Sequence, residues 1–104
     1  MTADCDCLLT LVVPAGIEDA LLEHLAAHPE WAGNIMVAHQ DGVGAGASLV
    51  SAMEKVRGRA RLALVTMPMP AQQVETLIQS VRREFPTPAL SWWTVPLTAY
   101  GRSG

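Results

Sequence analysis

Three features of the sequence predict an α+β fold of the ferredoxin-like βαββαβ type, a four-stranded antiparallel sheet with two helices on one face. Apolar and amphipathic segments follow the order strand, helix, strand, strand, helix, strand, which makes two similar halves. Prolines and glycines separate these segments. The chain has 104 residues, 50% of them hydrophobic and 16% charged, as expected for a globular chain with a modest core. We therefore expect residues 1–104 to form a single domain.

The first half begins with a predicted strand from Cys5 to Val13, which is rich in Leu, Val and Thr and is apolar on both faces. From about Ala15 the apolar spacing becomes helical, and the helix is expected to end at Pro29. The residues that fall at helical spacing are Ile17, Leu21, Leu25 and His28. A second strand is expected over 34–40, because Ile35, Val37 and His39 alternate there with Asn34, Met36 and Ala38.

The second half opens with a long connection that passes through three glycines and a predicted short helix over 48–56. A third strand is expected over 59–67, basic where it begins and stopped by Pro68. The second helix has the clearest periodic signal in the chain, and its stripe is Val74, Leu77, Ile78, Val81 and Phe85. The last strand is expected over 89–97.

This topology leaves one face of the sheet without helices, because right-handed crossovers place both helices on the same side. Both faces are apolar in sequence: Leu62 and Leu64 alternate with Ala63, and Trp92 and Trp93 fall on opposite sides. A soluble monomer rarely leaves such a patch exposed, so we expect the face to be buried against other copies of the chain.

Composition argues against several functional classes. The net charge of −3 and a pI near 5.4 argue against a nucleic-acid-binding protein. No apolar stretch reaches the roughly 20 residues that span a bilayer, and residues 1–6 are acidic where a signal peptide would be basic. We therefore expect a cytoplasmic protein that is not inserted in a membrane. No nucleophile has an adjacent base and no P-loop or metalloprotease pattern occurs, so we expect no enzymatic activity; the sequence names no cofactor.

A basic cluster is the strongest functional signal. Four of the seven basic residues lie within seven positions, and they are Lys55, Arg57, Arg59 and Arg61. In an extended segment the three arginines share one face at spacings of about 6.6 Å, where two charges repel by about 2.5 kcal/mol at an effective dielectric near 20. Such a row favours binding of an anion. A solvated edge strand and a salt bridge to Glu54 or Asp41 between subunits are the alternatives.

Two further groups of residues are candidates for binding. Gly42, Gly44 and Gly46 precede the basic cluster and could cradle a phosphate, although a flexible turn is the simpler interpretation. Cys5 and Cys7 share a strand face and His39 lies on another strand, so these three are candidate metal ligands, with buried core cysteines as the alternative. His24 and His28 are four residues apart on the first helix and could also clamp a metal, but a helix flank and a helix end are the favoured interpretation. Asp4 and Asp6, beside the cysteines, are expected to be solvated at a frayed terminus, with a role as hard metal ligands as the alternative.

Three segments resemble a PII-like family of unknown function whose genes often lie beside heavy-metal efflux pumps of the RND type. They are residues 6–14, 49–59 and 92–97 followed by Gly101-Arg102, and Val56-Arg57-Gly58-Arg59 is the most specific element. The resemblance implies a ferredoxin-like homotrimer, related to the PII signalling proteins and the CutA divalent-ion tolerance proteins, with three sheets facing one another.

The same resemblance implies a function. PII relatives bind small anionic effectors, commonly adenine nucleotides, between subunits, and a loop that corresponds here to about 42–58 reports the bound state to a partner, often a transporter. The chain has no good match to the PII nucleotide signature, so the effector stays unnamed. We expect a signalling protein that senses a small anion or a metal ion and acts on a partner such as an RND efflux pump. The alternative is a direct metal-binding protein with a CutA-like role in metal tolerance.

Overall fold

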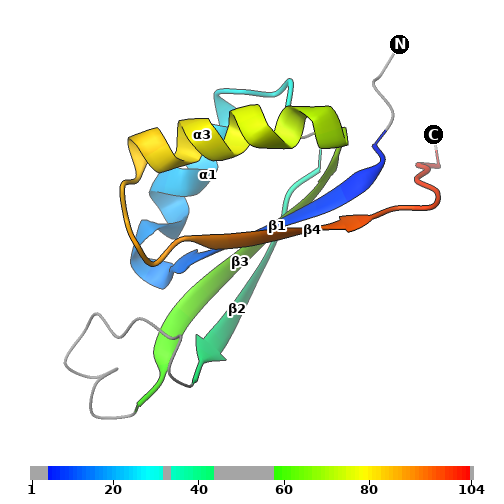
Figure 1. Ribbon diagram of the computed structural model, residues 1–104. Coiled ribbons are helices and arrows are strands. Elements are labelled where there is room, and N and C mark those ends of the chain that lie inside the picture. Colours follow the sequence, from blue (N-terminus) through cyan, green and yellow to red (C-terminus); the bar gives the residue numbers. More distant parts are fainter. Residues whose placement is uncertain (1–4, 32–33, 44–57, 104) are drawn as a thin grey trace.

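A computed structural model of the chain has the expected arrangement, and it describes residues 5–31, 34–43 and 58–103. Figure 1 shows two helices lying on one side of a twisted sheet. The strands are β1 (Cys7–Pro14), β2 (Met36–Gly42), β3 (Ala60–Met69) and β4 (Ser91–Pro96), and the helices are α1 (Glu18–Ala26) and α3 (Val74–Glu84). Short 3-10 turns, η1 (Ala15–Ile17) and η2 (Ala71–Gln73), lead into the two helices. The short helix expected over 48–56 lies outside the described residues.

The sheet order is β2-β3-β1-β4 and every neighbouring pair is antiparallel, so the ferredoxin-like prediction is confirmed. β1 is central, as its two apolar faces predicted. The hairpin formed by β2 and β3 extends beyond the helices, away from the chain termini (Figure 1). In the described part of the chain no helix is both long and apolar enough to cross a membrane.

The core lies between the sheet and the helices. The odd-numbered residues of β1 face the helices and pair with the odd-numbered residues of β3, so that Leu9 lies opposite Met67 and Leu11 opposite Val65. The helices contribute mainly Leu21, Leu25, Leu77, Ile78 and Val81, all of them buried. Trp31, which the sequence pattern did not place in the core, is also buried, because the turn after α1 folds back over the helix layer.

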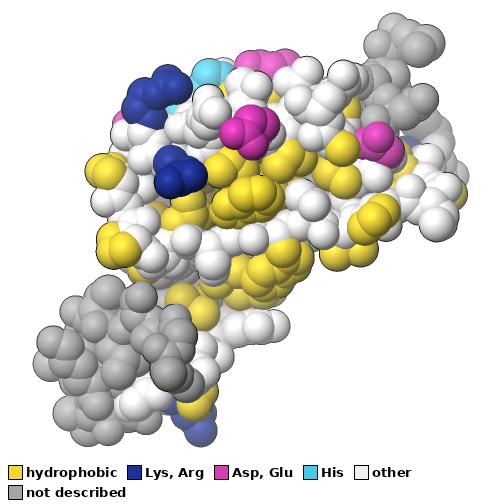
Figure 2. Space-filling model, in the orientation of Figure 1, with side chains coloured by type: hydrophobic (Ala, Val, Ile, Leu, Met, Phe, Trp, Pro, Cys, Tyr) yellow, Lys and Arg dark blue, Asp and Glu magenta, His cyan; other side chains and the backbone are white. Residues whose placement is uncertain are grey.

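The opposite face of the sheet is covered by no helix of the described residues, although Thr10, Val12 and Pro68 on it are buried. It is formed by Leu8, Thr10, Val12, Pro14, Met36, Ala38, Gln40, Leu62, Leu64, Thr66, Pro68, Ser91, Trp93 and Val95, which we call the open face. None of these side chains is charged. Figure 2 shows hydrophobic side chains beneath the helix layer and also on the side of the sheet away from the helices. At the centre, Thr10 and Thr66 share a hydrogen bond of 3.2 Å between their hydroxyl groups, which satisfies both.

The third strand is longer than the sequence predicted. Pro68 was expected to stop it, but β3 continues to Met69, and Pro68 lies opposite Leu8 of β1. A proline lacks the N–H that a central strand donates, so within sheets it is confined to edges. β2 pairs with β3 only as far as Thr66, so the β2 side of β3 is an open edge at Pro68, and the proline is tolerated there.

Gly58 lies two residues before β3 and has a φ of +67°, a left-handed conformation that side chains with a Cβ adopt only at a cost. A Cβ added there would meet no atom within 4 Å, so the cost comes from the backbone alone. Gly16 in η1 is a matched control, because a Cβ there also has open space and its φ lies outside the left-handed region.

We expect Gly58→Ala to lower the free energy of unfolding by about 1 kcal/mol, as placing Ala in the left-handed region does. Gly16→Ala is expected to leave stability unchanged or to raise it by up to about 1 kcal/mol, because alanine restricts the unfolded chain. Urea unfolding monitored by circular dichroism measures both values. Equal effects of the two substitutions would contradict the left-handed turn before β3.

Candidate functional site

A small pocket lies between η1 and the β2–β3 hairpin. Its volume is about 270 Å³, and it is lined by Ala15, His39, Gln40, Asp41, Arg61 and Leu62. The antiparallel register creates this site, because it places Asp41 of β2 opposite Arg61 of β3. Binding sites for small molecules usually enclose about 300–1,000 Å³. Within one chain, the pocket therefore suits a small anion or one part of a larger ligand.

Arg59 borders this site and pairs with Asp41, the Nη1 and Oδ2 atoms being 3.4 Å apart. The two side chains are 55% and 40% exposed, and ion pairs this exposed contribute only about 0–1 kcal/mol. The pair joins neighbouring strands of one chain, so Asp41 serves as an internal partner of the basic row. Because the pairing is weak, a stronger anion could replace the carboxylate.

On the other side of the pocket, His39 reaches the start of α1. Its Nε2 lies 2.5 Å from Oε1 of Glu18, which ties β2 to the helix layer. The two carboxylates of Asp41 and Glu18 offset the charges of Arg59 and Arg61 when His39 is neutral. The described part of the site is therefore less positive than the basic row in the sequence.

The structure brings four of the predicted effector-binding and metal-binding residues into one region: Gly42, Arg59, Arg61 and His39. The other candidates, Lys55, Arg57, Gly44 and Gly46, lie outside the described residues. Sequence reasoning missed Ala15, Glu18 and Gln40. No local pattern marks these three, because their place in the site depends on how β2 aligns with β3 and on where η1 begins.

The candidate metal ligands do not come together within one chain. His39 lies level with Ala63 and Val13, whereas Cys7 is six residues further along β1, a separation of about 20 Å along the strand. Cys5 and Cys7 are free thiols. Among residues 5–31, 34–43 and 58–103, no group of three or more His, Cys, Asp or Glu side chains is placed to hold a metal ion.

Cys7 behaves as a core residue. It is 4% exposed and packs in the hydrophobic core opposite Met69. Burial raises the pKa of the Cys7 thiol, and the nearby Asp6 and Cys5 raise it further. Since the thiolate is the form that binds metals and acts as a nucleophile, these surroundings disfavour both roles.

Asp6 is not simply solvated at a frayed terminus, as the sequence had indicated. Its Oδ1 accepts a hydrogen bond of 2.6 Å from the backbone N–H of Ala71, at the start of η2. A carboxylate there satisfies a backbone donor that the 3-10 turn leaves unpaired. The backbone oxygen of Asp6 also accepts a hydrogen bond from the N–H of Leu97. Asp6 therefore joins β1 to the segments before α3 and after β4.

Comparison with known proteins places the chain in a family without assigning it an activity. The model of the family DUF3240, described as a protein of unknown function, matches residues 3–104. No curated protein matches. The crystal structure of a DUF3240 family protein from Shewanella baltica OS155 is similar over 98% of this chain and 100% of that chain, with a TM-score of 0.76 and 16% identity. At this identity the likeness bears on the fold alone.

The raised pKa of Cys7 predicts a pH-dependent stability. A thiol whose pKa is higher in the folded chain contributes stability that is fully present below its unfolded pKa of about 8.5 and is lost as the pH rises through the folded pKa. We expect the free energy of unfolding in urea to fall less steeply above pH 8.5 in Cys7→Ala than in the unchanged chain. Cys5→Ala, which keeps the buried thiol, is the control. Parallel curves of unfolding free energy against pH for all three chains would contradict a raised pKa of the Cys7 thiol.

Proposed function

The chain belongs to the DUF3240 family of unknown function, and from this premise we propose that it is a PII-like regulatory protein. In this proposal it assembles as a homotrimer through the open face and binds a small anionic effector beside the β2–β3 hairpin. The bound state is then passed to a partner protein. Because of the resemblance to PII-like proteins, we expect the partner to be a transporter, such as a heavy-metal efflux pump of the RND type.

The observation that carries the proposal is the uncharged open face. Met36, Trp93 and Val95 are each between 48% and 49% exposed there, beside Leu62 and Leu64. Soluble monomers rarely expose a contiguous apolar surface of this kind. A second and a third copy of the same face would cover it, as three sheets in a closed ring do.

The energetics favour such an assembly. A tryptophan buries about 150–250 Å² in total, so covering the exposed half of Trp93 removes about 100 Å² from water and contributes about 2 kcal/mol per copy. The polar atoms at the centre of the face do not oppose burial, because the hydroxyls of Thr10 and Thr66 already share a hydrogen bond.

Effector binding is supported by the pocket beside Arg59 and Arg61. Replacing the exposed carboxylate of Asp41 costs only about 0–1 kcal/mol, whereas a hydrogen bond to a charged group contributes about 1.5–3 kcal/mol. An incoming anion could therefore take over the guanidinium of Arg59. The small volume within one chain fits a site that a neighbouring subunit completes.

The alternative function, direct metal binding at Cys5, Cys7 and His39 in a CutA-like role, has less support. Cys7 is buried with a raised pKa, and His39 is about 20 Å further along the sheet. Only convergence of several copies could bring these groups to one ion.

Assembly is tested by sedimentation of the unchanged chain at micromolar concentration, where we expect a trimer. Trp92 and Trp93 provide a matched pair, since they are adjacent on β4, 42% and 48% exposed, and point to opposite faces. Trp93→Lys places a charge on the open face and is expected to give monomers. Trp92→Lys is expected to leave the trimer intact. A monomeric unchanged chain would overturn the buried-face argument.

Effector binding is tested by calorimetry with ATP, ADP, AMP and inorganic phosphate. We expect at least one to bind, with affinity at least ten-fold weaker in Arg61→Ala and in the double variant Arg59→Ala, Arg61→Ala, because a charged hydrogen bond is lost. Arg82→Ala, on the exposed last turn of α3, is the control and should bind as the unchanged chain does. Absence of heat with all four anions, or equal binding by all variants, would count against an anionic effector at this site.

A further inference from the structure

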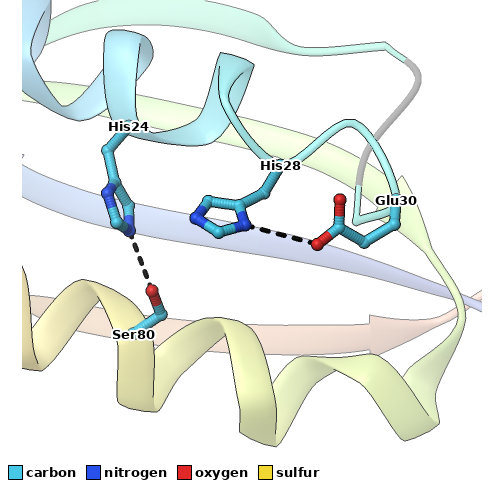
Figure 3. Close-up of polar contacts among 4 residues, drawn as sticks. All are labelled: His24, His28, Glu30 and Ser80. Atoms are coloured by element: carbon cyan, nitrogen blue, oxygen red, sulfur yellow. Dashed lines mark hydrogen bonds and ion pairs between the residues drawn. The ribbon is translucent and has the colours of Figure 1, made fainter.

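A cluster of aromatic and polar side chains lies on the helix layer, where α1 and the turn after it meet α3. Its members are His24, His28, Glu30, Trp31, Ser80 and Phe85. Two of the three histidines of the chain are here, and neither belongs to the pocket beside the β2–β3 hairpin. Figure 3 shows their rings side by side, between the carboxylate of Glu30 and the hydroxyl of Ser80.

His28 is held in a defined orientation. Its ring stacks on Trp31, with ring centres 4.2 Å apart and an angle of 16° between the planes. Its Nδ1 lies 3.3 Å from Oε2 of Glu30. A carboxylate at Nδ1 keeps the proton of a neutral imidazole on that atom, so the lone pair is on Nε2. This is the arrangement in which a carboxylate orients a metal-binding histidine.

His24 is fixed just as well, one turn earlier on α1. Its Nε2 lies 2.9 Å from Oγ of Ser80 on α3, and its ring meets Phe85 edge to face, with centres 5.8 Å apart. In Figure 3 the His28 nitrogen that does not face Glu30 is turned toward the Nε2 side of His24. The two nitrogens and the serine hydroxyl therefore border the same space.

The spacing of the two rings fits a shared metal ion. A zinc–nitrogen bond is about 2.1 Å, which puts the metal about 3.2 Å from the centre of an imidazole ring. Two rings at a tetrahedral angle then have centres about 5.2 Å apart. The ring centres of His24 and His28 are 5.2 Å apart, which is the spacing that two imidazoles on one ion would have.

We propose that His24 and His28 bind one divalent first-row transition metal ion through their Nε2 atoms, with Glu30 orienting His28. In the described part of the chain no third His, Cys, Asp or Glu completes the group, so Ser80 and water fill the remaining positions. Such a site is open and exchangeable. Its affinity follows the general order for nitrogen ligands, with Cu²⁺ above Ni²⁺ and Zn²⁺.

The site does not depend on the proposed effector or on assembly. It lies on the helix layer, on the opposite side of the sheet from the open face, so it stays accessible if that face is covered (Figure 1). It is also distinct from Cys5, Cys7 and His39. The competing interpretation is a purely structural role, in which the two rings only pack between the helices. It predicts that replacing His24 or His28 leaves the metal affinity of the chain unchanged.

Calorimetry of the full chain with Zn²⁺, Ni²⁺ and Cu²⁺, in a buffer that does not bind metals, tests the proposal. We expect one ion per chain, with affinity at least ten-fold weaker in His24→Ala and in His28→Ala. Glu30→Gln is expected to weaken binding about ten-fold, as loss of an orienting carboxylate does. His39→Gln, which removes the remaining histidine, is the matched control and should bind as the unchanged chain does.

Thermal unfolding guards against variants that merely fold poorly. Zn²⁺ should raise the melting temperature of the unchanged chain and of His39→Gln, and should leave those of His24→Ala and His28→Ala unchanged. The proposal is overturned if the unchanged chain binds none of the three ions at micromolar concentration. It is equally overturned if folded His24→Ala and His28→Ala bind with full affinity, or if the affinity is lost in Cys5→Ser, Cys7→Ser instead.

Discussion

The central strand β1 is apolar on both faces, whereas one chain supplies helices for only one of them, and the remaining structure follows from this imbalance. β1 pairs with β3 on one side and β4 on the other, and the helices that follow β1 and β3 in the chain pack over Leu9, Leu11 and their neighbours. Right-handed connections leave no element for the opposite face. The chain therefore has a packed core on one face of the sheet and no helix on the other face. The β2–β3 hairpin extends past the helix layer (Figure 1).

Local periodicity was enough to predict the described strands and the two α-helices, because the burial of each residue there follows from the spacing of its neighbours in the sequence. The stripe of α3 and the two faces of β1 each depend on spacings of a few positions, and both predictions were confirmed. Pro68 and Trp31 were misjudged or missed for the opposite reason. The proline is tolerated because of where a different strand stops, and the tryptophan is buried because a turn folds back. Neither fact is local.

The candidate sites show the same difference between features set by neighbouring residues and features set by distant parts of the chain. The sequence marked Arg59, Arg61, His24 and His28 as residues with binding chemistry. It named Asp41 as a possible ion-pair partner between subunits, but it did not mark Glu18 or Ser80. Arg59 meets Asp41 across 18 positions, His39 meets Glu18 across 21, and His24 meets Ser80 across 56. These partners are set by strand register and helix packing, which a single sequence does not encode in its spacing. Charge clusters are therefore visible in sequence, whereas the contacts that each charged group makes within the chain are visible only in the fold.

Pro68 and Pro96, at the margins of the sheet, bear on how this chain could associate edge to edge with other strands. Pro68 lies on the stretch of β3 that has no β2 partner, and Pro96 ends the edge strand β4. An exposed strand edge recruits further strands through its backbone donors, which is the route to open-ended fibres. Because a proline offers no donor, association edge to edge is interrupted at both places. In the proposed trimer the chains meet through the open face instead, and such contact would close into a small ring and then stop growing.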